Sequence, residues 1–213
     1  GIFDKRNISP DLASLDQFRD IPLLTKKDIQ KNTDRLISKR FEKGQLVSAK
    51  TGGSTGKALQ VYADRRWQEI RTADALRADR WANWDLGKRT AAIWGNPPVA
   101  LTWREKLRSS LIDRTIYLDT MLLSAETMGA FVKRYRQYRA ELIFGHAHSI
   151  YIFARFLRER GISDIRPKGI VSTSMMLIAA ERAVIEDVFQ CKVTNRYGCE
   201  EVGLIACECE RHD

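Results

Sequence analysis

The sequence predicts an α/β fold, in which a mostly parallel sheet carries helices on both of its faces. From Thr90 onward, short apolar runs alternate with longer segments of helical spacing, an order typical of parallel strands joined by helices. The apolar runs lack a clean alternation of apolar and polar residues, as expected of strands buried on both faces. No linker or internal repeat stands out, so we predict a single α/β domain over residues 1–213.

The predicted strands are short apolar runs, and the first two flank a glycine-rich stretch. Leu46-Val47 and Leu59–Tyr62 lie on either side of it and predict a hairpin. The later strands are predicted at residues 90–95, 115–118, 141–145, 169–173, 192–197 and 202–206.

The predicted helices have apolar residues near a 3.6-residue period or a recognisable beginning. Thr25 and Asp28 form a capping-box pattern, and Ser124 is a residue type favoured at an N-cap. His148 and Ser149 precede a helix that Gly161 closes. The helices are predicted at residues 9–18, 25–32, 64–84, 103–111, 124–137, 150–160 and 179–189.

The composition is that of a soluble globular protein. No apolar run approaches the length of a membrane span, and the first ten residues lack the core of a signal peptide, so we predict a cytoplasmic protein. The formal net charge of +9 indicates either a solvated basic face or attraction of polyanions such as ATP or coenzyme A. Nucleic acid is not the predicted partner, because no recognition motif is present. A homodimer is compatible with the sequence.

The stretch from Thr51 to Ala58 contains three glycines, one serine, two threonines and Lys57. Glycine allows backbone amides to approach a ligand closely, and successive amides form a nest that suits an anion. The spacing fits neither a P-loop nor the Rossmann fingerprint, since three residues rather than four separate Gly52 from Gly56. Two interpretations remain: a phosphate-binding loop or a flexible surface hairpin.

Small, polar or ionisable residues follow the predicted strands at their carboxyl ends, where open α/β sheets bind ligands. These strand ends are Gly95-Asn96, Gly145–His148, Thr173-Ser174 and Tyr197–Glu201. For the two histidines we favour a place in a pocket wall over metal ligation, because no carboxylate is near them in sequence. Glu200 and Glu201 are either solvated acids or a site for Mg²⁺, which takes one or two carboxylates together with phosphate oxygens.

The four cysteines cluster between Cys191 and Cys209. Cys207, Cys209 and His212 are of types that bind zinc, but their spacing is not the usual one. A zinc site and ordinary free thiols remain open, and free thiols are the favoured interpretation.

Two motifs carry a resemblance to a known family. Residues 51–57, TGGSTGK, resemble the phosphate loop of adenylate-forming enzymes, and residues 195–201, NRYGCEE, resemble their Y-G-x-T-E motif. The segments 21–28, 182–189 and 203–209 are similar to the phenylacetate–coenzyme A ligase branch, with its CapK-like relatives near capsular polysaccharide genes. The resemblance covers about residues 15–212.

The resemblance implies an AMP-forming acid–coenzyme A ligase. Such an enzyme activates a small-molecule carboxylic acid with MgATP as an acyl-adenylate and transfers the acyl group to coenzyme A. By resemblance, Lys57 and Glu201 are the catalytic residues, with Glu201 on Mg²⁺, while Tyr197 and Gly198 line the adenine and acyl pocket. The implied cofactor-binding residues are Thr51, Gly52, Gly53, Ser54, Thr55, Gly56, Lys57, Ser174, Asn195, Tyr197, Gly198 and Glu200.

The chain also departs from the family pattern. Glu200 replaces the threonine of Y-G-x-T-E, which removes a hydroxyl and adds a negative charge near the expected α-phosphate. Ala58 replaces the usual proline of the loop, and Met176 stands where the branch often has glutamate. No counterpart of the family's C-terminal domain follows, so we expect a truncated N-terminal AMP-binding domain that binds nucleotide without completing the reaction. The alternative is a non-catalytic nucleotide- or acyl-binding relative linked to polysaccharide biosynthesis.

Overall fold

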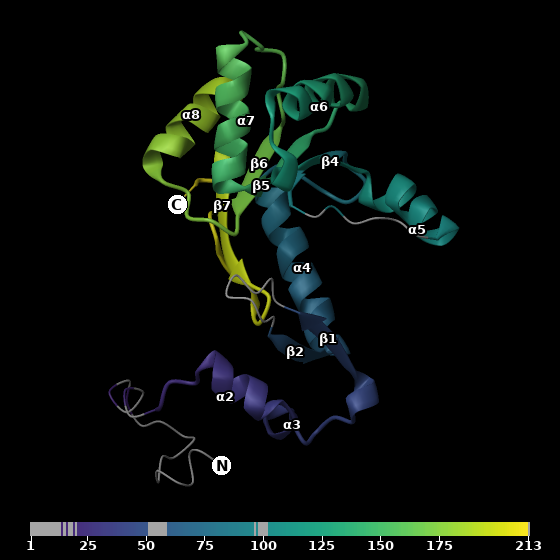
Figure 1. Ribbon diagram of the computed structural model, residues 1–213, viewed down its shortest axis with the longest axis vertical. Helices are drawn as coiled ribbons and strands as arrows, with labels where there is room; N and C mark the ends of the chain where they lie inside the picture. The colour runs from purple at the N-terminus through teal and green to yellow at the C-terminus, as the bar shows by residue number, and fades with distance from the viewer. Residues whose placement is uncertain are drawn as a thin grey trace. The chain divides into compact units, whose positions relative to one another are not determined.

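The computed structural model describes residues 14, 16, 19, 21–50, 59–95, 97 and 102–212. The chain divides into two compact units, residues 1–65 and 66–213, which are described here one at a time (Figure 1). The prediction of a single domain over 1–213 stays a prediction. Most of the helix predicted at 9–18 and all of the stretch 51–58 lie outside the described residues.

The first unit begins with a capped helix. The Asp28 N–H donates to Thr25 Oγ1 at 3.3 Å and the Thr25 N–H donates to Asp28 Oδ2 at 3.1 Å, which confirms the predicted capping box. The helices of this unit are α2 (Lys26–Lys31), α3 (Thr33–Leu36) and the 3₁₀ turn η2 (Lys43–Gln45).

The predicted hairpin is confirmed in its strands. β1 (Leu46–Lys50) and β2 (Gln60–Asp64) pair antiparallel, with Leu46 opposite Asp64 and Lys50 opposite Gln60. The glycine-rich stretch is therefore the connection of a two-stranded ribbon.

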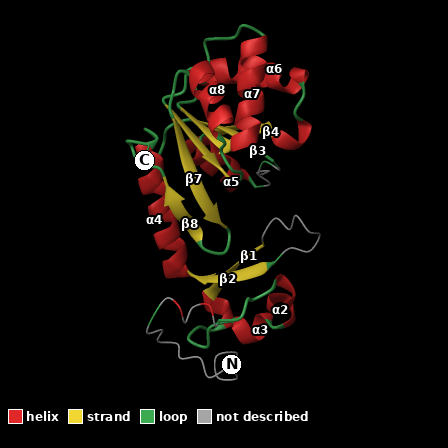
Figure 2. Ribbon diagram, turned by 90° about the vertical axis from the view of Figure 1, so that its left-hand side faces the viewer, coloured by secondary structure: helices red, strands yellow, loops and turns green. Residues whose placement is uncertain are grey.

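A six-stranded sheet organises the second unit. Its strand order is β4-β3-β5-β6-β7-β8, and the strands are parallel from β4 to β7. β8 runs antiparallel to β7 at the end of the sheet (Figure 2). The mostly parallel sheet is thus confirmed. The strands are β3 (Thr90–Trp94), β4 (Thr115–Asp119), β5 (Leu142–His146), β6 (Gly169–Thr173), β7 (Val193–Cys199) and β8 (Gly203–Cys207).

The helices of this unit agree with the prediction except at some ends. They are α4 (Arg65–Trp81), α5 (Trp103–Arg108), the π-helical turn η3 (Ser109–Asp113), the 3₁₀ turn η4 (Thr120–Leu122), α6 (Ala125–Tyr138), α7 (Ala147–Glu159) and α8 (Ala179–Phe189). The prediction that α7 begins at Ile150 is wrong, because His146 already ends the strand and serves as the N-cap. α4 ends before Leu86, since Asn83 adopts a left-handed conformation with φ 61°. No helix in the described part of the chain is long and apolar enough to cross a membrane.

Side chains on the two faces of the sheet enter different cores. Ile143 and Ile170 pack on the side of α6, α7 and α8, whereas Leu142 and Val171 pack with Ala82 at the end of α4. Helices therefore cover both faces, as predicted. Burying a large apolar side chain contributes roughly 1.5–3 kcal/mol, so the first core is the main source of stability. Its largest fully buried side chains include Phe153, Phe189, Ile93, Ile150 and Leu157.

Candidate functional site

A pocket of about 270 Å³ lies at the carboxyl ends of the strands in the second unit. Four of the residues predicted from the sequence line it: Ser174 after β6, Tyr197 and Gly198 in β7, and Glu200 after β7. The aromatic side chains Trp94 and Phe144 form a further part of the wall, and their ring centroids are 5.4 Å apart. The topology thus brings distant strand ends to one place, as expected for an open α/β sheet.

Glycines permit the tight approach of β7 and β8 beside this pocket. The pairing of the two strands shifts register between Tyr197 and Gly198. A Cβ on Gly198 would lie 2.4 Å from the Gly203 carbonyl oxygen, and Gly203 itself has φ +89°. A larger residue at either position would push the strands apart or strain the backbone. The close pairing of β7 and β8 therefore explains the glycine of the Y-G motif.

Ser174 is held in an unusual backbone conformation. Its φ of 65° places it in the left-handed region that residues other than glycine rarely adopt. Such strained residues concentrate at functional sites, and this one follows β6 at the pocket wall.

Glu200 forms an ion pair with Arg71 of α4. The two guanidinium NH2 groups donate to the two carboxylate oxygens at 3.2 and 3.1 Å, and one of them lies 3.4 Å from the Glu200 carbonyl oxygen. The side chains are 27% and 42% exposed for Arg71 and Glu200. The negative charge that replaces the family's threonine is therefore balanced within this chain.

Glu201, the next residue, has a different environment. Its side chain is exposed, and the described residues offer its carboxylate neither a hydrogen bond nor an ion pair. An exposed carboxylate without a partner suits Mg²⁺, which combines few protein ligands with phosphate oxygens. Of two adjacent acids, one is thus committed to an arginine and the other is available to a cation; the role of Glu201 stays a prediction.

A second arginine of the pocket wall, Arg196, forms an ion pair with a residue of α4. Arg196 in β7 donates to Asp79 of α4 at 2.7 Å, and the two side chains are 17% and 16% exposed. Burial raises the pKa of Asp79 above its usual value, although Arg196 opposes this effect. The guanidinium also lies 5.7 Å from the ring centroid of Phe144. Sequence reasoning missed the roles of Arg71, Arg196 and Asp79, because their partners lie more than a hundred positions away.

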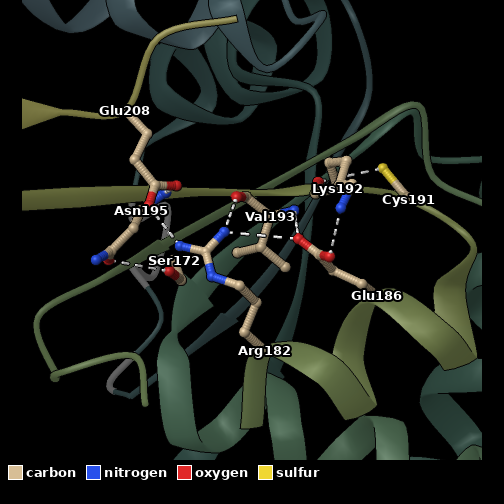
Figure 3. A network of polar contacts seen from close by, with 8 residues as sticks. All are labelled: Ser172, Arg182, Glu186, Cys191, Lys192, Val193, Asn195 and Glu208. Carbon is tan, nitrogen blue, oxygen red and sulfur yellow. Dashed lines mark hydrogen bonds and ion pairs between the residues drawn. The ribbon is translucent and has the colours of Figure 1, made fainter. Parts of the chain in front are cut away.

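Asn195 lies deeper in β7 and does not line the pocket. Its N–H donates to Glu208 at 2.8 Å and its side-chain oxygen accepts from Ser172 at 3.3 Å. Figure 3 shows that the Glu208 carboxylate also accepts from Arg182 of α8, whose guanidinium donates to the Val193 carbonyl oxygen at 2.8 Å. Arg182 and Glu208 therefore tie α8 to the strand that carries the Y-G motif.

Replacing Arg182 with alanine is expected to lower the free energy of unfolding by about 2–3 kcal/mol, because a charged, mostly buried partner is removed from Glu208. Urea denaturation measures this change. Arg155→Ala is the matched control: its pair with Glu159 is exposed, and we expect about 0.5 kcal/mol or less. Equal effects of the two substitutions would show that the network does not anchor β7.

The histidines differ from expectation in one respect. A carboxylate does lie beside His148, because its Nδ1 is 2.6 Å from an oxygen of the largely buried Glu181. The ring of His146 lies 4.1 Å from that of Trp94, and burial lowers the pKa of His146. The sequence could not show the Glu181 contact, since the two residues are 33 positions apart and come together only where α7 packs against α8.

The structure does not assemble the zinc ligands considered above. Across the described residues, no three side chains of histidine, cysteine, aspartate or glutamate gather as a metal site, so Cys207, Cys209 and His212 form no such set. These residues also contain no disulfide. The other predicted site residues, Thr51, Gly52, Gly53, Ser54, Thr55, Gly56 and Lys57, lie outside the described part of the chain.

Comparisons with known proteins bear on the fold of the chain. No protein-family profile matches the chain. Solved structures of a 2-hydroxyisobutyryl-CoA ligase include one with 2-HIB-AMP and CoA, which superposes with a TM-score of 0.66 at 14% identity over 99% of this chain and 51% of its own. A malonyl-CoA ligase with methylmalonyl-CoA and AMP matches with a TM-score of 0.53 at 21% identity over 78% of this chain and 35% of its own.

The chain has the adenylate-forming ligase fold. The resemblance deduced from the motifs is thereby confirmed at the level of the fold. The protein CapK of Staphylococcus aureus is 25% identical over 205 residues, which cover 94% of this chain and 45% of CapK. The chain thus spans about half the length of these two relatives.

Proposed function

We propose that this chain is the nucleotide- and acid-binding part of an AMP-forming acid–coenzyme A ligase. The observation that carries the proposal is the pocket at the carboxyl edge of the sheet, where Ser174, Tyr197, Gly198 and Glu200 meet. Tyr197 and Gly198 match the Y-G-x-T-E motif of a ligase family whose fold the chain shares, and Glu200 stands at the threonine position of that motif. The related structures hold acyl-adenylate or AMP together with CoA or an acyl-CoA, which supports ATP and coenzyme A as substrates.

The proposed site residues have separate tasks. The acid and the adenine lie against Tyr197 and Gly198, and the aromatic rings of Trp94 and Phe144 suit an acid with an apolar or aryl group, such as phenylacetate. The carboxylate of Glu201 binds the Mg²⁺ of MgATP. Lys57 and the amides of its glycine-rich stretch bind the β- and γ-phosphates. Bound Mg²⁺ neutralises charge that develops on the phosphoryl oxygens when the carboxylate attacks.

The pairing of Glu200 with Arg71 makes the departure from Y-G-x-T-E compatible with an anionic substrate. An unpaired carboxylate in this place would repel a phosphate group across a short distance. The bidentate contact with Arg71 cancels that charge.

Glu201→Gln is expected to weaken the binding of MgATP about tenfold and to leave the binding of ATP in EDTA unchanged, because the substitution removes one Mg²⁺ ligand charge. Isothermal titration calorimetry measures both affinities. Glu210→Gln is the control, since Glu210 is also exposed but lies beyond the end of β8, outside the Y-G motif. Binding of ATP that is saturable but equally sensitive to both substitutions would contradict the role of Glu201.

Exchange of labelled pyrophosphate into ATP tests the reaction itself. We expect exchange that depends on an added carboxylic acid, with phenylacetate as the first to try, when the protein is assayed in the length its gene encodes. A second candidate function, non-catalytic binding by a relative in polysaccharide biosynthesis, is favoured by the likeness to CapK. It predicts MgATP binding without exchange for any acid, whereas the absence of MgATP binding would contradict both candidates.

A further inference from the structure

Charged residues form a row at the amino-terminal ends of the parallel strands. Arg89, Glu141 and Lys168 directly precede β3, β5 and β6. Backbone hydrogen bonds of 2.7 Å connect them, from the Glu141 N–H to the Arg89 oxygen and from the Lys168 N–H to the Glu141 oxygen. Because the strands are parallel, this row lies at the opposite edge from the pocket described above, roughly 16 Å away for five residues at 3.3 Å each.

A cavity of about 700 Å³ opens beside this row. Its floor contains Tyr135, which is 4% exposed and whose hydroxyl donates to the Ala140 oxygen at 2.9 Å. Its charged lining residues are the cations Arg89, Arg136, Arg139, Arg166 and Lys168 and the anions Glu141 and Asp164.

The two carboxylates of the lining are already paired. Arg136 holds Asp164 through two hydrogen bonds of 2.7 and 2.8 Å, and Lys168 lies 2.8 Å from Glu141. Hydrogen bonds from the same cations hold the pKa of Asp164 and of Glu141 below their usual values. Both acids therefore stay ionised at neutral pH, and five cations against two anions leave three positive charges.

The three remaining arginines have other kinds of contacts. Arg89 stacks 5.8 Å from the ring centroid of Tyr138, and Arg166 donates to the Val188 oxygen at 2.8 Å. Arg139 is exposed, and in the described part of the chain its guanidinium has no carboxylate partner. The contacts of Arg89 and Arg166 are with a ring and a carbonyl oxygen, so they orient the two side chains without pairing their charges with a carboxylate.

The C-terminus of α6 offsets a small part of the positive charge in the cavity. Arg136 lies in its last turn and Arg139 is its C-cap residue, and cations are favoured at the C-terminus of a helix. A helix end offers roughly half a negative charge, which is less than the surplus in the cavity.

We propose that this cavity binds a small molecule through two or more linked phosphate groups. Guanidinium groups match phosphate geometry with paired donors, and a phosphate group carries roughly −1.5 to −2 charges at neutral pH. Two linked phosphate groups therefore balance the three surplus positive charges of the cavity, whereas a single carboxylate would not. The site is separate from the pocket at the carboxyl edge and does not rest on the proposed ligase activity.

Titration calorimetry with inorganic pyrophosphate and with ADP, both without Mg²⁺, tests the proposal on the 213-residue chain. We expect Arg139→Gln to weaken pyrophosphate binding about fivefold and Arg139→Gln with Arg166→Gln about twentyfold. Arg134→Gln is the matched control, because Arg134 lies exposed on the same helix outside the cavity, and it is expected to leave binding unchanged. Asp164→Asn is expected to tighten binding, since it removes a competing anion.

Three outcomes would overturn the proposal: no binding of either probe, equal weakening by Arg134→Gln and Arg139→Gln, and loss of binding on Lys57→Ala but not on Arg139→Gln. Equal loss would mean attraction by net charge, and loss on Lys57→Ala would place the phosphate at the glycine-rich stretch. If the proposal holds, ADP binding tighter than pyrophosphate identifies a nucleotide ligand, and pyrophosphate without ADP identifies the free anion.

Discussion

Replacing Gly169 with alanine is expected to lower the free energy of unfolding by about 4 kcal/mol or more, the range of severe core substitutions. A Cβ at this position would lie 1.6 Å from the Ala82 carbonyl oxygen and 2.8 Å from the Ala82 carbonyl carbon. Both are backbone atoms beyond the end of α4, so no side-chain rotation relieves the overlap. The end of α4 would have to move away from β6, and the core of Ala82, Leu142 and Val171 would open.

Gly129→Ala is the matched control for this substitution. Gly129 lies within α6, and a Cβ there would meet nothing within 4 Å. Alanine in a helix interior is favoured over glycine, so we expect a gain of about 0.5–1 kcal/mol. Urea denaturation followed by far-UV circular dichroism compares both variants with the parent at equal m-value. A Gly169→Ala protein within about 1 kcal/mol of the parent would show that α4 and β6 do not approach so closely.

The contrast between Gly169 and Gly129 shows which features of the fold could be predicted from the sequence. The apolar runs predicted the strands of the second unit, and the capping residues Thr25 and Ser124 predicted the beginnings of α2 and α6, because the physical causes are local. Gly169 entered the prediction as the first residue of a strand and Gly129 as part of a helix. Whether another backbone segment approaches a glycine depends on the tertiary fold, which no local pattern encodes.

The residues of the candidate site also divide into those that the sequence predicted and those that it did not. The strand-end rule placed Ser174, Tyr197 and Glu200 together, since it needs only the strand order to be mostly parallel. It did not identify Arg71 as the partner of Glu200, which lies 129 positions away. The zinc pattern at the end of the chain was compositional, and composition does not fix whether three side chains converge.

Removing one partner of the Asp79–Arg196 pair is expected to lower the free energy of unfolding by about 3–5 kcal/mol at pH 7, because an unpaired charge remains in a site less than one fifth exposed. The two single variants should respond differently to pH. After Asp79→Ala the guanidinium of Arg196 stays charged at every accessible pH, so the free energy of unfolding of this variant gains no pH dependence from the site. Asp74→Ala on the same helix, whose pair with Arg77 is exposed, is expected to cost about 0.5 kcal/mol or less.

After Arg196→Met, Asp79 can escape the penalty by taking up a proton. Burial already raises the pKa of Asp79 in the presence of Arg196, and nothing opposes that effect once the arginine is gone. A folded-state pKa above the unfolded value means that the loss is present above the folded-state pKa and disappears as the pH falls below the unfolded one. Urea denaturation at a series of pH values measures this, and parallel pH profiles for both single variants would contradict it.

The double variant Asp79→Leu with Arg196→Met separates the structural role of the pair from a functional one. Replacing both charges by apolar side chains of similar size is often neutral or stabilising, so the fold is expected to persist. Arg196 also lines the pocket in which we propose that the nucleotide binds. A stable double variant that binds MgATP as tightly as the parent would assign Arg196 to stability alone. Several-fold weaker binding would show that its charge attracts the phosphates as well.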